Sequence, residues 1–356
     1  MRYTHTLLAL SVLAVTAVLP VSATTFTFTG AANALWTDDD NWLPDYPGTV
    51  ILEGDVVVIE AECTIDGQSI VIHGGLTIAA GNKLILSGGG TIENWNQCIV
   101  FGELQLLSGT VLTNRGITTV HPAATVTNAA YLINNDGLLL NHGTVLNQSG
   151  GFQNSGFAQL IHATGASWTN TAQFDNGGIV LIEGTGFSNY TTFQNDGDLT
   201  ITGQFDNHGD LHNNSVVTIQ GLLTVTGGGS LLNHAILDVA PSGHCTVDGI
   251  FNNFVFGEIL HAGALVCESL GLFTNQGAVT TFPGSAVNNF GFMTNEGPIL
   301  HEGTFTNHGA FVSHHIVRNE GAIDNHGIFT VEPSGDLQLK DGSHFVSYEE
   351  GVLTIK

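Results

Sequence analysis

The chain has 356 residues, of which 31 are Asp or Glu and only six are Lys or Arg, so its formal net charge is −25. This composition excludes nucleic-acid binding, because no basic stripe is available to neutralise phosphates, and it disfavours anionic lipid surfaces. It also disfavours a polyanionic substrate unless metal ions intervene. Hydrophobic residues make up 42% of the chain, a share typical of a folded protein and not of a disordered one.

Residues 1–23 are predicted to be a cleaved signal peptide. Arg2 precedes an apolar stretch over residues 7–19, and the small residues that end at Ala23 form a site that a signal peptidase accepts. The stretch is too short for a membrane-spanning helix, and no other long apolar segment follows. We therefore expect a soluble mature protein without a membrane span, either secreted or held at the cell surface.

Residues 24–62 are predicted to form an N-terminal cap. The segment carries Trp36 and Trp42 and then the strand-like run 55–59, and it lacks the repeat that organises the rest of the chain. A protein built from stacked repeats needs its open ends covered, which makes a cap the natural interpretation.

A six-residue repeat organises residues 63–345. From Asn289 the chain reads NFGFMT, NEGPIL, HEGTFT, NHGAFV, SHHIVR, NEGAID and NHGIFT, with Asn usually first, Gly usually third and a large apolar residue always fifth. The same frame starts again at Asn189 and at Asn135. Six is a multiple of the two-residue period of a strand but not of the helical period of about 3.6, so only strands keep these apolar residues on one face.

The repeat predicts an all-β fold, a single-stranded parallel β-helix or β-solenoid. Three units close one coil of about 18 residues, and coils stack about 4.8 Å apart. Roughly sixteen coils give a rod about 75–80 Å long, and the rule for parallel crossovers favours a right-handed coil. The tail, residues 346–356, is predicted to be a C-terminal cap strand.

Residues one coil apart are expected to lie above one another. Asparagines in such a column form a ladder, because their side-chain amides bond along the axis of the rod. The predicted columns are Met293, Phe311 and Phe329; Phe305 and Ile323; and the ladder of Asn289, Asn307 and Asn325.

The repeat resembles that of large secreted β-helix adhesins of the haemagglutinin type. The opening, with Trp36, Trp42, Pro47, Gly54 and Asp55, is also similar to the start of many bacterial cell-surface solenoid proteins. This resemblance implies a right-handed β-helix with a surface or structural role. Hexapeptide acyltransferases, whose coils are left-handed, are a weaker match.

Two sets of residues are candidate metal ligands. Asp38, Asp39 and Asp40 could offer oxygens to Ca²⁺, but their spacing fits no calcium-loop motif, and an acidic turn is the favoured interpretation. His308 and His326 both follow an Asn and lie one coil apart, so their rings are expected to stack and could share Zn²⁺. Because other residue types occupy the same position of the repeat, a solvent-facing row is favoured over a metal site. No cofactor is predicted.

The mature chain retains four cysteines, which permit two disulfides in an exported protein. Cys245 and Cys267 are 22 positions apart, close to one coil, and are the predicted disulfide pair. Cys63 and Cys98 are 35 positions apart, near two coils, and their pairing is left open.

Two functions remain. The first is a non-enzymatic extracellular rod, structural or adhesive, that binds a surface, glycan or matrix component through flat faces and can associate through imperfectly capped ends. The alternative is a carbohydrate-active β-helix enzyme, a lyase or hydrolase, with an unrecognised site. Such an enzyme needs converging acids and bases, whereas Arg115 and Arg318 lie apart in the repeats. The sequence favours the rod and predicts no catalytic residues.

Overall fold

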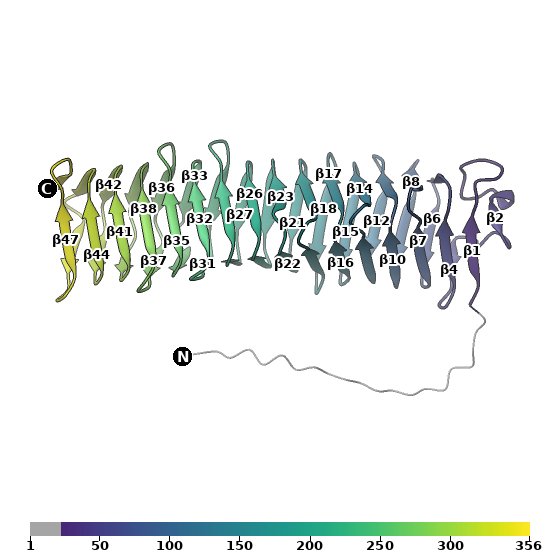
Figure 1. The fold of residues 1–356 in the computed structure, drawn as a ribbon, viewed down its shortest axis with the longest axis horizontal. Helices are drawn as coiled ribbons and strands as arrows, with labels where there is room; N and C mark the ends of the chain where they lie inside the picture. Colours follow the sequence, from purple (N-terminus) through teal and green to yellow (C-terminus); the bar gives the residue numbers. More distant parts are fainter. Residues whose placement is uncertain (1–22) are drawn as a thin grey trace, which may run out of the picture.

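The computed structural model describes residues 23–356, so the expected signal peptide lies outside the described residues except for Ala23. These residues form one elongated rod of short strands, with a single 3-10 turn, η1 (Asp39–Asn41), near the first end (Figure 1). The prediction of a parallel β-solenoid is confirmed.

Three parallel sheets form the walls of the rod. Sheet A runs from β1 (Thr25–Phe28) through every third strand from β4 (Val56–Ile59) to β46 (Asp336–Leu339). Sheet B runs from β5 (Cys63–Asp66) to β47 (His344–Ser347), and sheet C runs from β3 (Val50–Ile51) to β48 (Val352–Ile355). The strands β4 to β48 make up fifteen complete coils, with β1 and β3 in an incomplete first coil.

Each coil places a strand of about four residues on each sheet, and alternate residues face inward. In β41 (Thr304–Asn307), for example, Phe305 and Asn307 are buried. The apolar residue and the asparagine of each repeat unit therefore fill the interior, and the first and third residues of the strand face outward. The glycine lies at the corner that follows.

Corner glycines are required by close stacking. A Cβ on Gly327 would lie 2.1 Å from the carbonyl oxygen of Gly309 in the coil before. Neither residue has a positive φ, so the close approach of the neighbouring coil, and not a left-handed backbone, requires glycine at these corners.

The predicted columns are confirmed by the strand register. Met293, Phe311 and Phe329 lie above one another in β39 (Phe292–Asn295), β42 (Ala310–Ser313) and β45 (Ile328–Val331), and Phe305 lies above Ile323. In the predicted ladder of sheet B, the Nδ2–Oδ1 distances are 2.7 Å from Asn289 to Asn307 and 2.8 Å from Asn307 to Asn325.

A longer asparagine ladder runs inside sheet C. Each Nδ2 donates to the Oδ1 of the next asparagine at 2.7–3.0 Å, and the last donates to the hydroxyl of Ser313. Its members are Asn94, Asn114, Asn134, Asn154, Asn176, Asn195, Asn213, Asn233, Asn253, Asn275 and Asn295, and all are buried. Buried amides that satisfy one another in this way fix the register between coils.

The coils vary in length. From Val56 to Asp336, the first residues of β4 and β46, the chain advances 280 residues over fourteen coils, or 20 per coil. The expected 18 holds in the clean blocks, such as Asn289 to Asn307, and longer corners account for the rest.

The two ends of the rod differ. At the first end Trp36 and Trp42 are buried with ring centroids 4.7 Å apart, and β2 (Trp42–Leu43) pairs antiparallel with β1. The expected boundary at residue 63 falls inside the first complete coil, β4 to β6 (Ser69–Ile72). At the other end β47 and β48 continue sheets B and C in parallel register, so the tail forms part of the last coil.

Candidate functional site

A column of rings follows the corner between sheets B and C in the last four coils. Phe290 stacks on His308 with centroids 5.0 Å apart, His308 on His326 at 4.8 Å, and His326 on Tyr348 at 4.0 Å. The expected stacking of His308 and His326 is therefore confirmed. Because each inner ring has a ring on both faces, only ring edges point to solvent along the column.

The acidic turn near the first end is a capping structure. Asp38 precedes η1, and its Oδ1 accepts a hydrogen bond from the backbone N–H of Asp40 at 3.1 Å, while its Oδ2 accepts one from the side chain of Asn33. The hollow beside it is lined by Asp38, Asp39 and Asp40 with two other residues. Within residues 23–356 no three His, Cys, Asp or Glu side chains form a group that could hold a metal ion.

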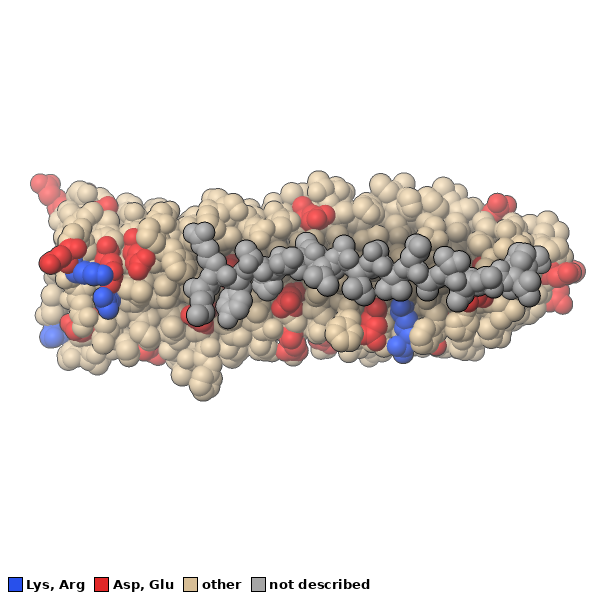
Figure 2. Space-filling view, turned by 90° about the horizontal axis from the view of Figure 1, so that it is seen from below, with Lys and Arg blue, Asp and Glu red and all other residues tan. Residues whose placement is uncertain are grey.

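Every Lys and Arg among the described residues forms an ion pair with a glutamate. The pairs are Lys83–Glu103 at 3.0 Å, Arg115–Glu93 at 2.8 Å, Arg318–Glu320 at 2.8 Å, Lys340–Glu320 at 2.5 Å and Lys356–Glu332 at 2.8 Å. In Figure 2 basic side chains lie directly beside carboxylates on the face shown. Such exposed pairs contribute little to stability, but they leave the remaining carboxylates to set the charge of the surface.

One shallow groove, at the corner between sheets A and B, combines charges of both signs. Its volume is about 410 Å³, and Glu62, Lys83 and Glu103 line it. Strand register places Lys83 beside Glu103 in the next coil. Among the residues that the structure describes, Lys83 is the one basic side chain that lines the groove, and its ion pair with Glu103 engages it.

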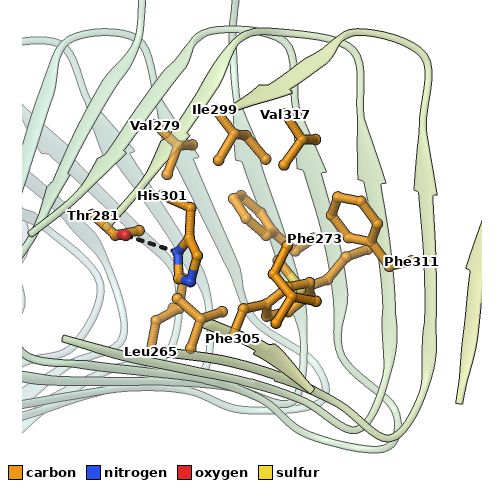
Figure 3. Close-up of a pocket in the computed structure, with 12 residues that line it drawn as sticks. Leu265, Phe273, Val279, Thr281, Ile299, His301, Phe305, Phe311 and Val317 are labelled. Carbon is orange, nitrogen blue, oxygen red and sulfur yellow. Dashed lines mark hydrogen bonds between the residues drawn. The ribbon is translucent and has the colours of Figure 1, made fainter. Parts of the chain in front are cut away.

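The interior cavity of the C-terminal third is small and apolar. It has a volume of about 40 Å³, and residues of all three sheets line it, among them Leu265, Val279 and Phe305 (Figure 3). The polar atoms at its edge bond to each other, since Thr281 Oγ1 and His301 Nδ1 lie 2.8 Å apart. The cavity has room for no more than a few water molecules.

Three histidines are buried in the wall of sheet A. Burial lowers the pKa of His162 and of His261 to about 4 and also lowers that of His301. Neither ring nitrogen of His261 has a hydrogen-bond partner. These imidazoles are neutral at pH 7 and belong to the core.

All four cysteines are buried and free, so the expected disulfide between Cys245 and Cys267 is absent from the structure. The two lie on adjacent coils, as expected, but Cys245 pairs with Leu265, and Cys267 pairs with Val247. An offset of two residues separates their Cα atoms by about 8 Å, beyond the usual range of roughly 4.4–6.8 Å for a disulfide. Burial raises the pKa of the Cys245 thiol to about 12.

One surface feature was not predicted from the sequence: a row of exposed apolar residues lies along the outside of sheet C in the last six coils. The signal was present in the fourth position of the repeat unit, where Phe292, Ala310 and Ile328 stand in the clean block. The predicted fold rests on the first, third and fifth positions and the predicted histidine row on the second, so the fourth position entered neither prediction.

Within the part of the chain that the structure describes, no helix is long and apolar enough to cross a membrane. No protein-family model matches the chain, and no curated protein sequence does. Among solved structures, the chain is similar to the TibC-catalysed hyper-glycosylated TibA55-350 fragment, with 14% identity, a TM-score of 0.25, and coverage of 93% of this chain and 97% of that one. A superposition this loose carries no functional argument, and the parallel β-solenoid rests on the strand register itself.

Proposed function

We propose that the protein works outside the cell as a non-enzymatic rod, structural or adhesive, which contacts a surface, glycan or matrix component through its flat faces. The observation that carries this proposal is the uninterrupted stacking of fifteen complete coils. It presents outward side chains in rows at the strand spacing on three sheets. Rows of equal, weak contacts suit multivalent attachment better than one deep pocket does.

The charge distribution supports a passive role. All five described basic residues are already paired with glutamates, which leaves an acidic surface that remains soluble and resists contact with other acidic molecules. A rod of this kind selects neutral or basic partners. The predicted export signal would place it where such partners are displayed.

Removal of one coil tests the proposal. Residues 190–207 form one 18-residue coil. After their deletion Asn189 is followed directly by His208, as Asn207 is in the native chain, and the two asparagines occupy the same position in successive coils. Binding of the mature protein to immobilised glycans and matrix proteins should weaken only modestly in this variant, because the deletion removes the outward side chains of one coil and leaves those of the other coils in place. Complete loss of binding would indicate a single site in that coil and would contradict the proposal.

The groove at Glu62, Lys83 and Glu103 favours the alternative, a carbohydrate-active enzyme, more than any other feature does. The assay is incubation of the mature chain with acidic and neutral polysaccharides, with and without Ca²⁺. Steady release of reducing or unsaturated ends that is abolished in Glu103→Gln would establish the enzyme. We expect no release.

A further inference from the structure

The outer surface of sheet C is free of charge over the last six coils. We call it the neutral face and define it as the outward first and third residues of β33 (Ile250–Asn253), β36 (Leu272–Asn275), β39, β42, β45 and β48. These residues are Ile250, Asn252, Leu272, Thr274, Phe292, Thr294, Ala310, Val312, Ile328, Thr330, Val352 and Thr354. In a chain with 31 carboxylates, this run of neutral positions calls for an explanation.

The first positions of these strands form a continuous apolar row. The register places Ile250, Leu272, Phe292, Ala310, Ile328 and Val352 side by side in successive coils. Five of them are large and exposed, from 43% for Ile250 to 53% for Val352. The third positions beside them are mostly threonine, which keeps the surface level.

The other two walls of the same six coils differ. Sheet A carries Asp238, Glu258, Arg318 and Asp336 at outward positions, and sheet B carries Asp324 with two histidines. Only sheet C combines large exposed apolar residues with an absence of charge. Contiguous exposed apolar surface of this kind marks an interaction site in soluble proteins.

We propose that the neutral face is a self-association surface, which packs against the same face of a second copy of this chain. Two copies, each with a formal charge of −25, repel each other wherever their carboxylates approach. The neutral face lets the sheet C strands of two rods approach along six coils with no acidic side chain on the strands between them, since the carboxylates of this region, such as Glu268 and Glu296, lie at the flanking corners. A flat, uniform face is also self-complementary under a two-fold axis, which a closed dimer requires.

The size of the face predicts a reversible dimer. Six strands of four residues cover about 25 Å by 13 Å, or roughly 300–400 Å² per copy. Exposed rings at the two flanking corners, Phe290 and Phe256, widen the apolar area. The total still falls short of the roughly 800 Å² per partner of a standard stable interface, so association should depend on concentration. The inference goes beyond the proposed function, because it does not depend on what the rod binds.

Sedimentation velocity of the full mature chain over a wide concentration range tests the proposal. We expect a monomer–dimer equilibrium that higher salt strengthens, since salt screens the repulsion between two acidic rods. Leu272→Glu and Ile328→Glu should each raise the dimer dissociation constant about tenfold or more by placing unpaired charge in the contact. Ile179→Glu is the matched control, because Ile179 is 45% exposed at the first position of β22 (Ile179–Ile182) on sheet A. It should dimerise like the wild type.

Both test residues face outward, so unchanged circular dichroism and thermal unfolding should accompany the loss of the dimer. A wild type that stays monomeric at every concentration would overturn the proposal, as would a dimer that Leu272→Glu leaves intact. A third outcome would also overturn the proposal: the wild type is monomeric and is retained on a neutral polysaccharide matrix, whereas Leu272→Glu is not retained. That result would assign the neutral face to glycan binding. The coil deletion tests ligand binding separately, so failure of one proposal can be distinguished from failure of the other.

Discussion

Removal of one side chain from the asparagine ladder of sheet C should destabilise the rod far more than removal of its exposed neighbour. Asn213 makes four hydrogen bonds. Its Nδ2 donates to Asn233 Oδ1 at 2.7 Å and to the Ile236 carbonyl at 2.8 Å, and its Oδ1 accepts from Asn195 Nδ2 at 3.0 Å and from the Ser215 N–H at 3.3 Å.

The magnitude follows from the groups that Asn213→Ala leaves without partners. Asn195 Nδ2 keeps its bond to the Val216 carbonyl, but Asn233 Oδ1 and the Ser215 N–H lose the partners that Asn213 provides. An unsatisfied buried polar group costs about 1–3 kcal/mol, so the free energy of unfolding should fall by about 2–6 kcal/mol. Asn214, the next residue, is exposed and bonds to Asp196, so Asn214→Ala should change it by less than about 0.5 kcal/mol.

Guanidinium unfolding followed by circular dichroism, with limited proteolysis beside it, is the assay. Proteolysis is needed because stacked repeats can unfold locally, and a single global transition then underestimates the local loss. Asn213→Ala should lower the midpoint and expose cleavage sites in the neighbouring coils, and Asn214→Ala should do neither. Equal midpoints and equal cleavage for the two variants would refute the account of the ladder.

Three further outcomes follow from the core. Because burial lowers the pKa of His261 to about 4, the folded state binds fewer protons than the unfolded state. The contribution of His261 to stability should therefore fall by about 3 kcal/mol as the pH drops from about 6.5 to 4 and should level off below that, in addition to the losses from His162 and His301. A His261→Leu variant that keeps the full pH dependence of the wild type in denaturant titrations would contradict this. Phe311, which packs 4.6 Å from Phe329 between ring centroids, should cost about 3–5 kcal/mol when changed to Ala, whereas the outward Phe292→Ala should be near neutral in the same unfolding assay. In peptide mapping without reduction Cys245 should be a free thiol that reacts with thiol reagents only after unfolding, and a 245–267 linkage would show that our register is wrong there.

The sequence was sufficient to predict the fold where the repeat is clean. A six-residue period with an apolar fifth position leaves only a strand geometry, and the 18-residue coil that follows placed Phe311 under Met293 and His308 beside His326. The ladder from Asn289 to Asn325 followed from the same phase.

The sequence was not sufficient where corners change the coil length. In the sheet C ladder, Asn134 and Asn154 are 20 residues apart, whereas Asn154 and Asn176 are 22 apart. A constant spacing of 18 residues therefore does not predict that these asparagines lie above one another. The same effect misled the disulfide prediction. The local coil is 20 residues, because His244 pairs with Ala264, and a separation of 22 therefore leaves Cys267 two residues out of step with Cys245.

The interior of sheet C and the neutral face depend on the same strands. In β36, Asn275 points inward and bonds to Asn253 and Asn295 at 2.7 and 2.8 Å, while Leu272 and Thr274 point outward. Because the ladder fixes the spacing and register of the strands from β33 to β42, it also keeps the first four positions of the outward row in line. A surface that must match itself over six coils tolerates little slippage between them, since a shift of one residue would turn buried side chains outward. Buried amides that bond only in one register provide that constraint in the first four of these coils. Loss of the Asn275 side chain should therefore weaken self-association even though no atom of the neutral face is changed.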